Sequence, residues 1–501
     1  LLGAVDIYTG RILWETKLPT MYTFGGGGGG LGIHSKKHPQ PWAYEPAMDF
    51  DVKPTERCRA SGFNYASMSD AIYVAAGRHM LVFDPRNGQQ VKAWPVPLQG
   101  TDLRWGGLSI EGDVLVATLF SPRDLADAQA GHDGNGGDWA GDRMPMKHMV
   151  AIDRHTGQLL WHRAATWGYI NRSGVCIGGG KVFAVDRLTD RVMKKLAEAG
   201  RDLPTGQPPM LVALDLKSGR QAWRFPLDVY VQNIAYSTKH NLLLVPNRNL
   251  VEWRDGKWHN LAFDQRRGKT NKNAPGRMRA LRGDDGHVVW QVEDAAYHTP
   301  YIVLGDLLID RYGNPYDLLT GQRNLRTSPI TGVAETWDFR KGGCNHLVAC
   351  DNMVTWRTAF YDLAGDAGVM KLTGFDAGCS PTLLPAGGVL NIPNFGTHHK
   401  RNRMTAMALV HRPRNHLWTT YTPPRPAEAT AFKRVGYNLG APGDRFADDG
   451  TVWLQFDSRN RANGQIDPRD VSWFQFHPDQ AGSFIASSGV VGQATITLPT
   501  I

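Results

Sequence analysis

The chain has 501 residues and a net charge of +9, with 56 Lys and Arg against 47 Asp and Glu. This mild excess of positive charge is typical of a solvated surface. The sequence shows no clustered basic face and no known module that would indicate a nucleic-acid partner. Five Cys are too few for a disulfide scaffold and form no C-x-x-C zinc or haem pattern, and no apolar run approaches the roughly 18 residues of a membrane helix.

Residues 149–161 contain the unit around which the chain is organised. An apolar run ends in Asp153, Thr156 and Gly157 follow, and a second apolar run ends in Trp161. Two such runs around a Gly-containing turn predict a β-hairpin. Asp153 can accept hydrogen bonds from the backbone N–H groups ahead of it, and Gly157 can supply a positive φ. Trp161 is large enough to pack against a neighbouring copy.

This hairpin recurs, which indicates a propeller or a solenoid. We count eight copies, at residues 4–14, 81–94, 149–161, 212–223, 279–290, 316–321, 360–363 and 406–418. The last three are weaker: the copy at 316–321 lacks the Trp, and the copy at 406–418 lacks the Asp. The repeat residues that we expect to be structural are Asp6, Trp14, Asp84, Trp94, Asp153, Trp161, Asp215, Trp223, Trp290 and Asp317.

A second pair of strand-like runs precedes each hairpin from Phe63 onward, for example residues 108–119 before 149–161. Four strands per unit is the construction of a propeller blade. The pattern predicts seven whole blades and a half-blade at residues 4–14, so we expect an all-β, eight-bladed β-propeller of four-stranded blades. The half-blade would be completed by residues upstream of Leu1 or by strands from 447–498, because an open propeller leaves sheet edges exposed.

Four insertions interrupt this pattern. Residues 15–62 contain a glycine run and read as a flexible basic loop, and residues 121–147 hold Asp and Asn side chains that suit a polar loop or, alternatively, Ca²⁺. Residues 187–200 predict one short helix. Residues 251–279 are the most basic insertion, which suits either a solvated loop or an anionic polymer or surface.

The repeats end after Trp418, and a proline cluster at 423–426 marks a boundary. We therefore predict a propeller over residues 1–426 and a small C-terminal β extension, or a propeller-closing segment, over 427–501. The chain begins inside a repeat and without Met, so we expect it to be a processed or partial product whose targeting signal lies upstream.

The unit Ala-x-Asp-x-x-Thr-Gly-x-x-x-Trp of residues 151–161 resembles the PQQ repeat of quinoprotein-type, eight-bladed β-propellers. That superfamily includes quinone-dependent alcohol dehydrogenases and the lipoprotein that scaffolds outer-membrane protein assembly. Other segments are similar to secreted bacterial proteins of the PQQ-binding-like propeller type, namely 361–363, 378–379, 384–393, 408–411, 440–445 and 447–451. The resemblance covers nearly the whole chain and implies the fold, which hosts catalysts and scaffolds alike.

The catalytic branch of that superfamily carries a vicinal Cys-Cys disulfide over the quinone, and this chain has no adjacent cysteines. Its calcium ligands and the Trp beneath the quinone map to no single stretch here. PQQ and Ca²⁺ are thus possible cofactors without support from a motif, and no cofactor is the expectation. The sequence also lacks the G-x-S-x-G and H-E-x-x-H patterns of hydrolases and zinc proteases.

Cys344 and Cys379 each follow a Gly at the start of successive blades. The similar secreted proteins carry a Cys-x-Cys pair after the position of Pro393, where this chain has His398 and His399 instead. Two readings stay open: structural cysteines, either buried thiols or a disulfide between two of Cys344, Cys350 and Cys379, and a Zn or Cu site formed by Cys344, Cys379, His398 and His399. We favour structural cysteines with an exposed His pair, since Lys400 and Arg401 disfavour a cation.

Taken together, these features predict a non-catalytic binding or scaffolding propeller with protein partners in a larger periplasmic or extracellular complex. The alternatives are a quinoprotein-type oxidoreductase, which would bind PQQ and Ca²⁺, and a metal-holding subunit of a redox complex.

Overall fold

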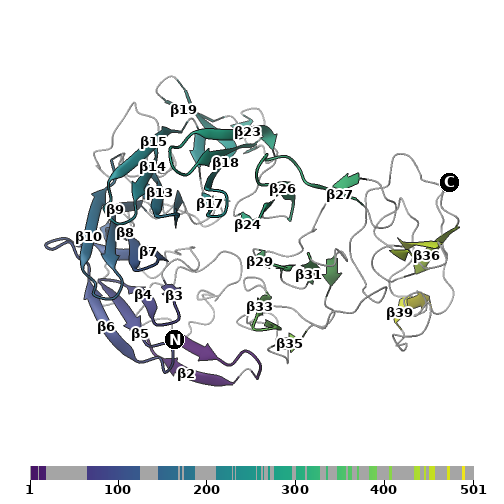
Figure 1. Cartoon of the computed structure of the whole chain (residues 1–501), viewed down its shortest axis with the longest axis horizontal. Coiled ribbons are helices and arrows are strands. Elements are labelled where there is room, and N and C mark those ends of the chain that lie inside the picture. Colours follow the sequence, from purple (N-terminus) through teal and green to yellow (C-terminus); the bar gives the residue numbers. More distant parts are fainter. Residues whose placement is uncertain are drawn as a thin grey trace. The chain divides into compact units, whose positions relative to one another are not determined.

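The computed structural model describes a set of segments in which every named element is a β-strand (Figure 1). No helix in these segments has the length and apolar character needed to span a membrane. The described residues are 2–9, 11–18, 65–123, 145–166, 170–171, 174–186, 210–227, 229–231, 233–254, 257–260, 263–264, 269–270, 276–295, 301–310, 313–327, 334–336, 347–356, 359–363, 369–371, 383–391, 406–408, 434–439, 445–446, 451–456, 471–473 and 488–490.

The chain divides into two compact units. The first comprises Leu1–Asp306 with the short segments Leu318–Gly321 and Phe395–His398, and the second comprises the remainder. The boundary predicted near residue 426 is untested by this division and stays a prediction.

Four antiparallel sheets in the first unit have the strand order of propeller blades, with consecutive strands paired from first to fourth. The first two sheets are β3 (Tyr65–Ser67), β4 (Ile72–Ala76), β5 (His79–Phe83) and β6 (Gln90–Pro95), then β7 (Arg104–Glu111), β8 (Val114–Phe120), β9 (Pro145–Asp153) and β10 (Leu159–Ala164). The next two are β12 (Val175–Gly178), β13 (Lys181–Asp186), β14 (Met210–Asp215) and β15 (Gln221–Pro226), then β17 (Ala235–Ser237), β18 (Leu242–Arg254), β22 (Gly276–Arg282) and β23 (Val288–Ala295).

Short strands extend these sheets. β11 (Ile170–Asn171) pairs with β9, while β16 (Val229–Val231) and β19 (Lys257–Asn260) pair with β18. The unit also contains the hairpin of β1 (Leu2–Val5) and β2 (Ile12–Thr16), the pair β20 (Phe263–Asp264) and β21 (Lys269–Thr270), and β24 (Ile302–Leu304).

The core lies between successive sheets, which follow one another in chain order (Figure 1). On β9, Met149 packs toward the sheet of β12–β15, whereas Val150 packs toward the sheet of β3–β6. Side chains alternate across a strand, so a sheet with buried neighbours on both faces has nearly continuous apolar central strands. This explains the unbroken burial of Val114–Phe120 in β8.

Each repeat Trp packs on the turn of the next copy. The Trp161 indole Nε1 donates to the carbonyl of Leu216 at 2.8 Å, and its ring lies where a Cβ on Gly219 would come within 2.6 Å. Gly219 also has a φ of +68°. Only glycine can both adopt this φ and leave room for the ring without strain. Trp14, Trp223 and Trp290 make the same donor contact, to Pro85, Gly283 and Leu318, and Trp94 packs on Gly157.

The repeat Asp holds this turn in place. Asp153 Oδ1 accepts from the backbone N–H groups of His155 and Thr156 at 3.0 and 2.8 Å, and from the Thr156 hydroxyl at 2.9 Å. Asp6 and Asp215 bond their own turns in the same way, and Asp84 pairs with Arg86 inside its turn. At Asp317 the backbone N–H bonds the Gln322 carbonyl at 2.9 Å, which closes the equivalent turn.

The second unit contains a four-stranded sheet, β29 (Val348–Cys350), β30 (Met353–Thr355), β31 (Ala359–Asp362) and β32 (Val369–Lys371), and the three-stranded β33 (Leu384–Ala386), β34 (Val389–Asn391) and β35 (Ala406–Ala408). Its remaining strands are β25 (Leu307–Ile309), β26 (Pro315–Asp317), β27 (Leu325–Thr327), β28 (Ala334–Thr336), β36 (Arg434–Leu439), β37 (Arg445–Phe446), β38 (Thr451–Phe456), β39 (Val471–Trp473) and β40 (Ser488–Val490).

These sheets confirm an all-β, β-propeller construction, while the number of eight blades stays a prediction.

The half-blade predicted at residues 4–14 is the β1–β2 hairpin. Leu2 and Trp14 pack against the sheet of β3–β6, so this hairpin lies in the stack. Within the described segments β38 pairs with β36 and β37, and β39 pairs with β40, so none of these strands completes the β1–β2 sheet. The helix predicted at 187–200 falls outside the described residues.

Replacement of Trp161 with Ala should lower the free energy of unfolding by about 3–5 kcal/mol, the usual range for a buried large aromatic side chain. Trp161 is 8% exposed and bridges two sheets. Urea denaturation would measure the loss. Leu159, which is exposed on the same strand, provides the control: Leu159→Ala should change stability by less than about 0.5 kcal/mol. A loss under about 1 kcal/mol for Trp161→Ala would contradict the assigned role.

Acid should weaken the turns. Hydrogen bonds from the Arg86 side chain and backbone lower the pKa of Asp84 to about 2, and turn hydrogen bonds also lower the pKa of Asp153 and Asp215. A lowered carboxyl pKa contributes stability that is present above about pH 4 and is lost as pH falls toward the folded value.

The difference in unfolding free energy between pH 5 and pH 3 should therefore be smaller in Asp84→Asn than in the wild type. Between pH 6 and 8 the two proteins should differ by a constant amount, because this carboxyl does not titrate there. An unchanged acid dependence in the variant would refute the assignment.

Candidate binding face

The two ends of the blades in the first unit differ in their connections. At one end, tight turns join the first strand to the second and the third to the fourth, as at Gly112–Asp113 and 154–158. At the other end, the second and third strands are joined by the long segments 121–144, 187–209 and 255–275 in three of the four blades. We call these the turn end and the loop end.

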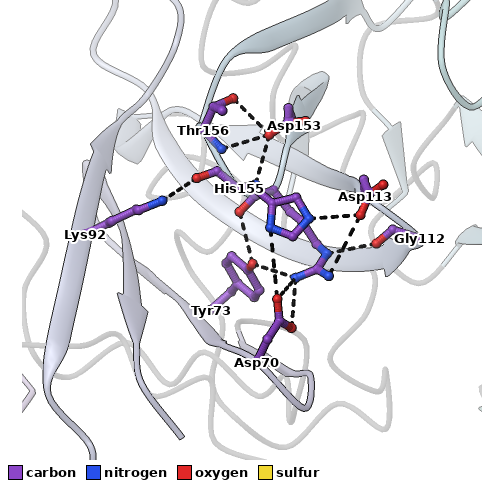
Figure 2. Close-up of polar contacts among 9 residues, drawn as sticks. Asp70, Tyr73, Lys92, Gly112, Asp113, Asp153, His155 and Thr156 are labelled. Carbon is purple, nitrogen blue, oxygen red and sulfur yellow. Dashed lines mark hydrogen bonds and ion pairs between the residues drawn. The ribbon is translucent and has the colours of Figure 1, made fainter.

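Polar contacts between neighbouring blades fasten the turn end. Arg154 Nη1 donates to both carboxylate oxygens of Asp70, at 2.7 and 3.0 Å, and to the Tyr73 hydroxyl at 3.1 Å (Figure 2). Its Nε donates to the Gly112 carbonyl at 2.9 Å. The Arg154 guanidinium thus binds the turn between β3 and β4 in one blade and the turn between β7 and β8 in the next. Arg154 itself lies in the turn between β9 and β10 of that second blade.

Tyr73 performs a role that Trp performs elsewhere. Its hydroxyl donates to the Arg154 carbonyl at 3.0 Å. Arg154 directly follows the repeat Asp153, so this carbonyl is equivalent to those of Pro85 and Leu216, which accept from Trp14 and Trp161. Between these two blades the carbonyl therefore accepts its hydrogen bond from a Tyr hydroxyl instead of a Trp indole.

The charges in this cluster stabilise one another. The hydrogen bond from Arg154 lowers the pKa of Asp70, and burial raises the pKa of Tyr73. Burial alone would lower the pKa of Arg154, but its bonds to Asp70 and Tyr73 raise it above the ordinary value. His155 Nε2 lies 2.9 Å from Asp113 Oδ1 (Figure 2). Because each carboxylate faces a cation, the cluster links the blades rather than presenting a catalytic acid and base.

Similar links follow around the turn end. Glu111 Oε1 accepts from the Gly180 N–H at 3.1 Å, and Lys181 pairs with Asp284 at 2.8 Å. Asp306 accepts from both Lys239 and His240 at 2.6 Å. The described part of this end is thus a chain of blade-to-blade contacts.

At the loop end, buried polar residues fix the ends of two strands. Asp186, the last residue of β13, is 1% exposed, and its Oδ2 accepts from the Thr166 N–H at 2.7 Å. Arg104, the first residue of β7, is 2% exposed and pairs with Asp102 at 2.7 Å. The segment 187–209, which follows Asp186, therefore starts from a fixed position, as in a binding surface carried by a rigid scaffold.

The predicted metal-site residues Cys344, Cys379, His398 and His399 lie outside the described residues, as does the possible calcium segment at 133–138. Cys350 is a free thiol whose Sγ lies 3.2 Å from Asn352 Oδ1, so the structure shows neither of the disulfides proposed for it. Cys176 is also free, and burial raises the pKa of its thiol. Among the described residues no three His, Cys, Asp or Glu side chains gather as a metal site.

The Arg154–Asp70 link could not be predicted from the sequence. The two residues are far apart in the chain, and the other repeats have no Arg at the position after the Asp that would have marked it. The pair His148 and His162, described below, could not be predicted from it either.

A family model described as "Outer membrane protein assembly factor BamB" matches residues 145–310, which contain the strands β9 to β25. The repeats of this chain are therefore of the PQQ type, and its sheets are those of a β-propeller. The match spans the Asp153, Asp215 and Trp290 copies that the sequence predicted. No curated protein matches the chain.

Among solved structures, BamB from Moraxella catarrhalis is 13% identical with a TM-score of 0.37, and the alignment covers 71% of this chain and 88% of that one. The quinohemoprotein alcohol dehydrogenase ADHIIG from Pseudomonas putida HK5 is 15% identical with a TM-score of 0.32, covering 60% and 51%. A europium-containing methanol dehydrogenase is 12% identical with a TM-score of 0.35, covering 62% and 78%. Likeness at this level carries no argument about function, and the fold rests on the sheets themselves.

Arg154→Met should lower the free energy of unfolding by about 1–3 kcal/mol, because it removes a charged hydrogen-bond donor that is 10% exposed while Asp70 keeps partial access to water. Arg86→Met is the control, since Arg86 is 86% exposed and bonds only within one turn. Its loss should be clearly smaller. Equal losses in the two variants, measured by urea denaturation, would contradict an inter-blade role for Arg154.

Proposed function

We propose that this chain is a non-catalytic binding or scaffolding propeller that contacts protein partners through its loop end. The observation that carries the proposal is the placement of the connections: the long segments 121–144, 187–209 and 255–275 all depart from one end, and the other end has tight turns that blade-to-blade contacts fasten together. Stacked blades hold such segments at fixed spacing, which suits recognition of a broad surface.

The description of the matching family model, an outer-membrane protein assembly factor, supports a role within an assembly. We therefore place the proposed complex in the periplasm or at the cell surface, with the chain as a subunit and without bound PQQ or Ca²⁺. The basic composition of residues 251–279 would favour an acidic partner surface.

Site-specific photo-crosslinking in the native envelope tests this proposal. A photo-reactive residue at Arg123, exposed at the loop end after β8, should give a discrete crosslinked product. The same residue at Lys217, exposed in the turn between β14 and β15, is the matched control and should give none.

Two outcomes would contradict the proposal. One is crosslinking at Lys217 with none at Arg123, which would place the partner at the turn end. The other is stoichiometric near-ultraviolet quinone absorption in the purified protein, which would indicate a quinoprotein oxidoreductase instead.

A further inference from the structure

Two histidines face each other across the hairpin of β9 and β10. His148 Nδ1 lies 2.9 Å from His162 Nε2, and the ring centroids are 5.0 Å apart with an interplanar angle of 43°. His148 is half-buried and His162 is exposed, so the pair is open to solvent on one side.

A β-bulge places both rings on the same face of the sheet. The register shifts between Leu159 and Trp161, after which His162 pairs with Val150. Paired residues share a face, as do residues two apart in one strand, so His162 lies on the face of Val150 and His148. Without the shift, His162 would pair with Met149 and point to the opposite face. The bulge therefore creates the pair.

The platform beneath the pair is fixed. Met149 and Val150, which follow His148, are fully buried in the cores on the two sides of the sheet. Trp161, next to His162, is bonded to Leu216 in the following blade. His148 is therefore held on a buried strand, and His162 on an edge strand that the Trp161 bond ties to the next blade, so both ligands lose little backbone entropy when they close on an ion.

The chemistry of the two ligands limits the metal. Imidazole nitrogens bind first-row divalent metals, and Cu²⁺ ranks highest among these ions in affinity for a given site. Ni²⁺ shares with Cu²⁺ a preference for tetragonal nitrogen sites. The two imidazoles of this pair therefore favour these two ions.

We propose that His148 and His162 form a two-histidine site for Cu²⁺ or Ni²⁺, in which the metal replaces the hydrogen bond between the rings. Each ring must turn so that its lone pair points to the metal, which the solvent-exposed side of the pair permits. Among the described residues, these two histidines are the protein ligands of the site. This site is independent of the function proposed above, because it needs no partner at the loop end.

Titration of tag-free protein with CuCl₂ alone tests the site. We expect one Cu²⁺ per chain to bind at this pair, with an electron paramagnetic resonance spectrum that shows two nitrogen ligands. In His148→Ala and in His162→Ala the affinity of that ion should fall at least about tenfold, since one of two protein ligands is lost. Copper should also raise the Tm of the wild type, and this increase should disappear in both variants.

His79→Ala is the matched control, because His79 is an exposed histidine on β5 of the neighbouring sheet. It should bind copper as the wild type does. His162→Gln, which keeps a polar side chain of similar length, guards against misfolding: its Tm without metal should match the wild type while its copper site is lost. Copper binding and Tm shifts that persist in all His148 and His162 variants would overturn the proposal.

Discussion

The packing of a Trp indole on the glycine of the next turn is the contact on which the first unit depends. The ring of Trp161 occupies the space that a side chain on Gly219 would need, and its N–H reaches the carbonyl of Leu216. Each contact joins one blade to its successor, so burial of the apolar faces between sheets and closure of the turns reinforce one another. Where a turn starts with Asp, as at Asp153 and Asp215, the carboxylate holds the carbonyl and the glycine where the indole meets them.

This contact also separates the two ends of the blades. Because the indoles, the repeat turns and the first-to-second turns meet at the turn end, charged side chains there lie close enough to pair between blades, as Arg154 does with Asp70 and Lys181 with Asp284. The loop end also has contacts between blades, as Asp102 with Arg78 and Asp186 with Thr166, but its second-to-third connections can be long without changing the turns that meet the indoles. The same packed strands that carry these segments also hold His148 and His162 within bonding distance.

Much of the fold was predictable because its signals are local or repeated. The hairpin expected at 149–161 is β9 and β10, since the apolar runs and Gly157 act on neighbouring residues. The family match at 145–310 confirms the repeat type. The contact of Trp161 with the next copy could be expected because repetition brings equivalent surfaces together. The Arg154–Asp70 link could not, because no other copy has an Arg at the position of Arg154 and the charges of the chain allow many other pairings.

The sequence by itself therefore determined the strands, the turns and the packing of each repeat Trp against the next copy, because short-range turn chemistry and a repeated apolar pattern leave few alternatives. Only the tertiary structure decided which charged residues meet between blades, which end of the stack the long segments depart from, and which face His162 occupies. The last depends on a bulge between Leu159 and Trp161, and a shift of one residue reverses the face of every side chain that follows.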